Sequence, residues 1–339
     1  AEYPRIQKEF LSGEFPPDIL EKFRALLNQV GDQPIIVRSS SLLEDNFGTS
    51  FAGKYESHFC PNQGAPEKNL KDFTRAIIRI YASIFNPDAL LYRRAKGLLD
   101  YDERMAVLIQ TVQGERAGKY YFPHAAGVAF SRNLYRWSPQ IVRDDGFMRL
   151  VWGLGTRAVD RVGNDYPRLV ALSHPLLHPE ASPKDIRRYS QQYIDLIDLE
   201  ANEFKTLPVE DVLDTRHPVS RYIAQVYQGG FLSPLRMALS GMDRGNLVLT
   251  FDELLKRTSM AKRFTRMLNI LEEKYLSPVD TEFTIDIINP NSMQPEVQIS
   301  LLQCRPQSHL KESEARLPKN LLDEDVVFST HRMAPEGRI

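Results

Sequence analysis

The chain has 339 residues, of which 42% are hydrophobic and 26% charged, so it is long enough to bury a sizeable core and to form about two or three subdomains. No run approaches the roughly 18 to 20 uninterrupted apolar residues that a bilayer span needs, and the opening residues lack the basic-then-apolar pattern of a secretory signal. A formal net charge of -1 gives no electrostatic drive toward nucleic acid or an anionic membrane, so neither is an expected partner.

The two cysteines, Cys60 and Cys304, are far apart and lack the paired spacing of a zinc site. This usage excludes a disulfide framework and fits a cytoplasmic location. The first residue is Ala1, and the last ten, THRMAPEGRI, look like the start of a strand. We therefore expect the chain to be a piece of a longer protein.

In the first half of the chain, helical and strand-like patterns alternate. Residues 1–31 have helical periodicity, and the next segment, QPIIVR, predicts a short buried strand. A long helical stretch at residues 68–96 is broken at Asn86 and Pro87. Three strand-like runs follow, MAVLIQTV, GVAFSR and MRLVWGLG. This alternation favours an α+β or mixed α/β architecture over a helical bundle or an all-β sandwich.

The second half is less regular until its end. Between residues 173 and 246 the pattern is interrupted by prolines, with a helical segment near residues 219–226. Residues 251–275 predict one strong amphipathic helix. Two strands follow, DTEFTIDI and VQISLLQCR, separated by the polar loop INPNSMQPE. They predict a hairpin with a long tip.

The densest chemical signal is the segment VRSSSLLEDNFGTSFAGKYES at residues 37–57. A buried strand ends there on Arg38 and is followed by three serines. A guanidinium fixed at a strand end, beside hydroxyls and the backbone N–H groups of a turn, suits phosphate oxygens. The alternative is a serine-rich turn that caps a helix, with Arg38 paired to Glu44 or Asp45.

A second signal lies on the predicted hairpin. Alternate residues of its first strand project from one face. Oxygen ligands beside an amide and a guanidinium are what a Mg2+ ion bridging nucleotide phosphates requires. The alternative is an ordinary solvated strand face. The residues in question are Asp280, Glu282, Thr284 and Asp286 on the first strand, and Gln303 and Arg305 on the second.

The segment VWGLGTRAVDRVGNDYPRLV, which contains Gly153 and Gly155, is weaker evidence, because a Gly-x-Gly alone is usually only a loop. The sequence contains neither the Walker-type Gly-x-x-x-x-Gly-Lys-Ser/Thr pattern nor the dinucleotide Gly-x-Gly-x-x-Gly pattern. Any nucleotide must therefore be held in another way.

Taken together, these segments resemble the ATP-grasp domain at the front of phosphoenolpyruvate synthases and pyruvate phosphate dikinases. VRSSSLLED…SFAGKYES is similar to the family pattern V-R-S-S-A-x-x-E-D…S-F-A-G-x-x-E-S/T. MAVLIQ, GVAFSRN and WGLG match its central strands in order, and SPVDTEFTI…LLQCRP resembles P-x-D-I-E-F/W…L-Q-x-R-P. The match runs from Ile35 to Pro306 and implies two lobes with a nucleotide cleft between them.

The resemblance implies a set of site residues. It assigns nucleotide binding to Arg38, Asp280, Glu282, Gln303 and Arg305, with Glu282 and Gln303 as metal ligands. The implied cofactors are ATP and Mg2+. Catalysis by such a domain would consist of positioning an in-line phosphoryl transfer and neutralising its charge, with Arg38 and Arg305 as the catalytic cations.

The resemblance also implies partners. ATP would phosphorylate a histidine on another domain of the same polypeptide, which would carry the phosphoryl group to pyruvate and yield phosphoenolpyruvate. The module also occurs with glucan or antibiotic acceptors, and a degenerate module that only senses nucleotide is a further alternative. The resemblance allows a homodimer of the full-length protein. The expected divisions are residues 1–120 and 121–310 for the lobes and residues 311–339 for a linker.

The chain departs from the family pattern at three points. The early glycine-rich stretch with its phosphate-binding lysine would precede residue 1. Thr156 follows WGLG where the family usually has glutamate, and the loop between Glu282 and Gln303 is longer than in the family pattern. His124 in FPHAAG superficially resembles a phosphohistidine motif, but it lacks the preceding Thr-Ser and leads directly into a predicted strand. We expect it to be a strand residue and not a phosphate carrier.

Overall fold

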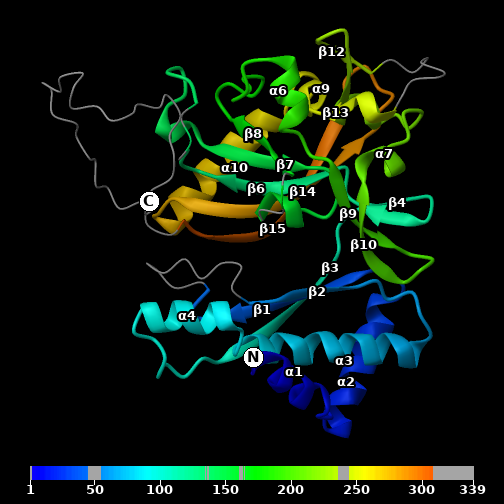
Figure 1. The fold of residues 1–339 in the computed structure, drawn as a ribbon, viewed down its shortest axis with the longest axis vertical. Coiled ribbons are helices and arrows are strands. Elements are labelled where there is room, and N and C mark those ends of the chain that lie inside the picture. Colours follow the sequence, from blue (N-terminus) through cyan, green and yellow to red (C-terminus); the bar gives the residue numbers. More distant parts are fainter. Residues whose placement is uncertain are drawn as a thin grey trace, which may run out of the picture.

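A computed structural model describes residues 2–44, 55–133, 135, 137–159, 163, 165–235 and 244–307. The chain forms two lobes stacked along the long axis of the molecule (Figure 1). The stretch DNFGTSFAGK of the segment at residues 37–57 and the linker expected at residues 311–339 lie outside the described residues.

The first lobe packs helices against one face of a small antiparallel sheet. Ile35 and Val37 of its central strand point to this face and are fully buried, and Phe73 and Ile80 of the longest helix pack against them. The break expected before Pro87 is confirmed, because the Asn86 side chain accepts a hydrogen bond from Asp88 N and starts a new helix. The helices are α1 (Tyr3–Leu11), α2 (Pro17–Val30), α3 (Pro66–Ser83) and α4 (Pro87–Ala95). The sheet order is β2 (Ser57–Cys60), β1 (Ile35–Ser41) and β3 (Met105–Thr111).

The second lobe is built on a five-stranded sheet. Its order is β15 (Glu296–Pro306), β14 (Val279–Ile288), β6 (Ala125–Phe130), β7 (Phe147–Val151) and β8 (Arg168–Ala171). Odd-numbered residues of β14 are buried, and among them Phe283 meets Phe264 of α10 (Met260–Tyr275) edge-on, with ring centroids 4.4 Å apart. The opposite face of β14 is therefore left for the cleft between the lobes.

Two smaller sheets complete the second lobe. One has the order β10 (Glu203–Pro208), β9 (Tyr193–Asp198), β5 (Tyr120–Phe122) and β4 (Glu115–Ala117). The other has the order β12 (Phe231–Pro234), β11 (Ala224–Gln228) and β13 (Leu247–Leu249). The short helices are α5 (Thr156–Val159), α6 (Pro183–Arg188), α7 (Val209–Val212), α8 (Ser220–Ile223), α9 (Asp252–Arg257) and the 3-10 turns η1 (Arg143–Asp145) and η2 (Arg244–Asn246).

The α+β class is confirmed, since helices and strands are both abundant and every strand pairing between the named strands of the described residues is antiparallel. Two local predictions were wrong. The helix expected over residues 251–275 is split at Thr258 and Ser259 into α9 and α10. The helix expected near residues 219–226 lasts only through α8 and continues as strand β11.

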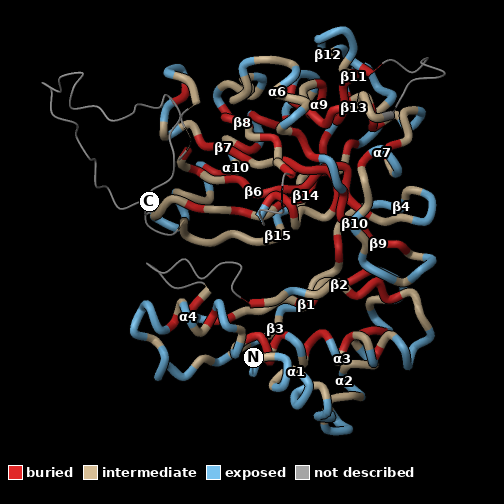
Figure 2. Tube along the Cα trace, viewed as in Figure 1, coloured by how far each residue is buried: buried red, intermediate tan, exposed pale blue. Residues whose placement is uncertain are grey.

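Each lobe has its own buried core, visible as separate red regions in Figure 2. The hairpin of β4 and β5 pairs with β9, so the chain already belongs to the second lobe at residue 115. The lobe boundary expected near residue 120 stays a prediction, and this pairing favours a position closer to 112. Among the described residues, no helix has the length and apolar character needed to cross a membrane.

Candidate functional site

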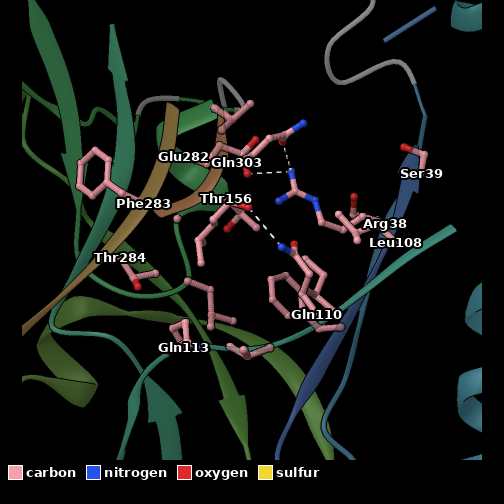
Figure 3. Close-up of a pocket in the computed structure, with 18 of the residues that line it drawn as sticks. Arg38, Ser39, Leu108, Gln110, Gln113, Thr156, Glu282, Phe283, Thr284 and Gln303 are labelled. Carbon is pink, nitrogen blue, oxygen red and sulfur yellow. Dashed lines mark hydrogen bonds and ion pairs between the residues drawn. The ribbon is translucent and has the colours of Figure 1, made fainter. Parts of the chain in front are cut away.

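A cavity of about 290 Å3 lies between the lobes (Figure 3). Strands of both sheets form its walls, β1 and β3 from the first lobe and β14 and β15 from the second. The glycine turn after β7 closes one side. The lining residues used below are Ile36, Arg38, Ser39, Glu44, Leu108, Gln110, Gln113, Gly155, Thr156, Glu282, Thr284, Gln303 and Arg305.

Arg38 joins the two lobes across this cavity. Because Ile35 and Val37 face the first core, the alternation of β1 turns Arg38 toward the opposite side. Its Nη2 atom lies 2.7 Å from Glu282 Oε2 and donates a hydrogen bond of 2.9 Å to Gln303 Oε1. Figure 3 shows the guanidinium reaching these two side chains from the facing strand. The structure thus brings together three of the five predicted residues.

The alternative interpretation was that Arg38 pairs with Glu44 or Asp45. Among the described residues, Arg38 instead contacts Glu282 and Gln303. The Glu44 carboxylate accepts a hydrogen bond of 3.0 Å from Ser39 Oγ, while Arg38 is engaged by the second lobe. Asp45 lies outside the described residues.

A β-bulge sets which side chains of β15 face the cavity. Glu282 pairs with Gln303, but Phe283 pairs with Leu301, so Leu302 is an extra residue in the ladder. The Leu302 carbonyl accepts a hydrogen bond of 3.2 Å from Gln110 Nε2 of the first lobe. The long hairpin loop therefore does not displace Gln303, which lies directly opposite Glu282.

Asp280 and Arg305 form a second pair on the same hairpin. They are opposite each other in the ladder, and Arg305 Nε donates a hydrogen bond of 2.8 Å to Asp280 Oδ1. Arg305 lines the cavity, whereas Asp280 is not among the described residues that do. The pair indicates that Asp280 orients Arg305. A direct contact between Asp280 and ligand or metal stays a prediction.

The glycine turn at residues 153–155 is held by a buried carboxylate. Gly153 and Gly155 adopt φ values of +101° and +91°, which favour glycine, and Leu154 N donates to the Asp195 backbone oxygen at 3.0 Å. Thr156 Oγ1 donates to Asp195 Oδ2 at 2.5 Å. Thr156 therefore lines the cavity while its hydroxyl hydrogen is donated to Asp195. It occupies the position at which the family pattern has glutamate.

Asp286 does not share the cavity with Glu282, although strand alternation places both on one face of β14. It lies beside His124 and Glu115, where burial raises the pKa of its carboxyl group. One of its carboxylate oxygens, Oδ1, is buried and has no hydrogen-bond partner among the described residues. The expectation that four residues of this face form one ligand set is thus wrong for Asp286.

His124 has a structural role. It is only 5% exposed, its Nδ1 accepts a hydrogen bond of 2.9 Å from Ile287 N, and its Nε2 lies 2.5 Å from Glu115 Oε1. The backbone donor requires an unprotonated Nδ1, so Nε2 keeps its hydrogen and donates it to Glu115. This hydrogen bond lowers the pKa of Glu115. Both ring nitrogens are thus engaged within the fold, and the expectation that His124 is not a phosphate carrier stays a prediction.

The sequence interpretation missed Leu108, Gln110 and Gln113, which line the cavity from β3 and the segment after it. A signal was present. Val107 and Ile109 pack on the first core, so Leu108, which is 41% exposed, must point the other way. Leu108 and Gln110 are opposite Arg38 and Ile36 in the ladder, which places them on the cavity face.

The chain matches the family described as "Pyruvate phosphate dikinase, AMP/ATP-binding domain" over residues 1–325. It is 25% identical to a phosphoenolpyruvate synthase of Aeropyrum pernix over 98% of this chain and 36% of the relative. It is 29% identical to a phosphoenolpyruvate synthase of Pseudomonas aeruginosa over 47% of this chain and 19% of the relative. A rifampicin phosphotransferase of Streptomyces sviceus is 34% identical over 34% of this chain and 12% of the relative.

The chain therefore spans at most 36% of the length of these three relatives. Its two-lobed α+β structure agrees with the ATP-grasp architecture that the motifs imply. The motifs, the fold and the match over residues 1–325 lead to one conclusion: the chain belongs to the family of pyruvate phosphate dikinase AMP/ATP-binding domains.

Proposed function

We propose that the cavity between the lobes binds ATP together with Mg2+, as the phosphate-donating module of a dikinase. The observation that carries this proposal is the convergence of Arg38, Glu282 and Gln303 from opposite lobes on one point of the cavity. A cation for phosphate and hard oxygen donors for a metal then lie side by side.

The side chains present fit a magnesium ion. Glu282 Oε2 and Gln303 Oε1 both approach the same Arg38 nitrogen, at 2.7 and 2.9 Å, so the two oxygens already surround a positive group. A carboxylate and an amide oxygen are suitable Mg2+ ligands, and phosphate oxygens and water would complete the coordination. When bound, the ion would neutralise charge on the phosphates.

The other residues would orient the nucleotide. Arg38 and Arg305 would bind phosphate oxygens and stabilise the negative charge that builds up on them during transfer. Asp280 would hold Arg305 in place through their 2.8 Å hydrogen bond. Burial of the cavity between two lobes would limit competing attack by water.

The acceptor is proposed from the relatives. We infer that the phosphoryl group passes to a histidine on another domain of the same polypeptide and then to pyruvate, because the match covering 98% of the chain is to a phosphoenolpyruvate synthase. An antibiotic acceptor is the second candidate, favoured by the 34% identity to a rifampicin phosphotransferase over 117 residues.

Isothermal titration of the purified chain with ATP, with and without Mg2+, tests the nucleotide proposal. We expect saturable binding of Mg-ATP and loss of affinity in Arg38→Ala. Absence of binding under both conditions would refute the proposed function.

A further inference from the structure

The groups proposed to bind phosphate and metal are bound to each other in this structure. Arg38 Nη2 and Glu282 Oε2 are 2.7 Å apart, and the two side chains are only 17% and 20% exposed. We call Arg38 and Glu282 the interlobe pair, because one member comes from β1 and the other from β14. A phosphate oxygen cannot take up this guanidinium nitrogen without separating it from Glu282.

We propose that the interlobe pair makes nucleotide binding conditional on a divalent cation: Glu282 excludes metal-free nucleoside triphosphate from Arg38, and a cation bound by Glu282 removes that exclusion. The inference rests on the proposed function and adds a selection step to it. It requires the Glu282 carboxylate to weaken nucleotide binding when no metal is present and to strengthen it when a metal is bound.

The electrostatics give the reason. If metal-free triphosphate filled the cavity and took Arg38 from Glu282, the nucleotide would shield the carboxylate from water and leave it beside a polyanion. Like charges in such a setting repel strongly, because the local dielectric constant is lower than that of water. A divalent cation between Glu282 and the phosphates turns this repulsion into two attractions and leaves Arg38 free to bind phosphate.

The contact between Arg38 and Glu282 can break without separating the two lobes. At another point of the interface Phe59 and Phe204 stack with ring centroids 5.3 Å apart, and Gln63 N donates a hydrogen bond of 2.9 Å to Asn202 Oδ1. These contacts involve none of the proposed phosphate or metal ligands. They can hold the lobes together while Arg38 changes partner.

The test compares ATP affinity in EDTA and in Mg2+ for the unmodified chain and for Glu282→Gln, which keeps the side-chain size and removes the charge. The unmodified chain should bind Mg-ATP at least about tenfold more tightly than metal-free ATP, within the usual range for coupled ligands. Glu282→Gln should bind metal-free ATP about five- to tenfold more tightly than the unmodified chain does, and should lose most of the gain from Mg2+. Glu282→Ala provides the same comparison if the glutamine variant does not fold.

Glu272→Gln is the matched control, because Glu272 of α10 is likewise bonded to an arginine, Arg132, is 23% exposed and is not among the described residues that line the cavity. It should leave metal-free affinity within about twofold, since the charge that it removes is not beside Arg38. If Glu282→Gln and Glu282→Ala bind metal-free ATP no more tightly than the unmodified chain, or Glu272→Gln binds it as tightly as Glu282→Gln does, the inference is overturned while the nucleotide site stands. An unmodified chain that binds neither form of ATP overturns the proposed function as well.

Discussion

Replacing Arg38 with alanine removes the guanidinium that reaches from the first lobe to the second. One of its nitrogens is held in the cavity by two oxygens at 2.7 and 2.9 Å, and a phosphate bound together with Mg2+ would replace Glu282 as its partner. A hydrogen bond to a charged group contributes about 1.5 to 3 kcal/mol. We expect the Kd of Mg-ATP to rise about ten- to a hundredfold in Arg38→Ala.

Stability should change far less than affinity. The interlobe pair is about one-fifth exposed and borders a cavity, so water can enter and solvate Glu282 once Arg38 is gone. A loss of about 1 kcal/mol, or about 3 °C in Tm, is expected for such a pair. Isothermal titration at saturating Mg2+ gives the Kd, and thermal unfolding gives the stability.

Arg38→Lys is the matched control, because it keeps the positive charge and removes the planar guanidinium, whose Nη2 atom contacts both oxygens. It should bind Mg-ATP with an affinity between those of the unmodified chain and the alanine variant. If Arg38→Ala remains folded and its Kd stays within twofold of the unmodified value, Arg38 does not contact the nucleotide and the site assignment is wrong.

Three further substitutions test the surroundings of the site. Gly153→Ala should lower the free energy of unfolding by about 3 kcal/mol, measured by chemical denaturation. The reason is that residue 153 has a φ of +101° and the new Cβ would lie 2.5 Å from the Asp195 backbone oxygen. An unchanged denaturation midpoint would contradict this account of the turn. Phe264→Ala removes a fully buried ring and should lower the free energy of unfolding by about 3 to 5 kcal/mol in the same measurement. A loss below about 1 kcal/mol would contradict the packing of α10 against β14. Asp286 has a raised folded-state pKa, so its charged form destabilises the chain at pH 7 and its protonated form does not. Asp286→Asn should therefore raise the Tm at pH 7, and the gain should shrink as the pH falls through that pKa; a gain independent of pH would exclude this cause.

The sequence predicted the elements whose patterns are long and local. The periodicity of α3 and the alternation of β14 follow directly from their own residues. The break between α9 and α10 was missed because the apolar spacing continues across Thr258 and Ser259. The change from α8 to β11 was missed because Ala224 begins pairing with Leu249, a contact 25 residues away that local propensity cannot show.

The site was predicted as a set of residues but not as an arrangement. Motif resemblance placed Arg38 and Gln303 in one site although they are 265 residues apart. It could not show that Arg38 bonds to the same oxygens that are proposed to bind metal, because that contact depends on how the two lobes meet. Alternation correctly placed Asp286 on the face of Glu282, yet it gives no information on where the cavity ends along the strand.

The extra residue Leu302 also affects which insertions and deletions the hairpin of β14 and β15 can accept during evolution or design. It lies between the hairpin tip, residues 289–295, and the residues that face the cleft. Leu302 O is tied to Gln110 of the other lobe, so the cleft end of β15 has an anchor that does not depend on the tip. Insertions or deletions in the tip should therefore be tolerated without moving Gln303, whereas deletion of Leu302 would turn the residues on one side of it to the opposite face.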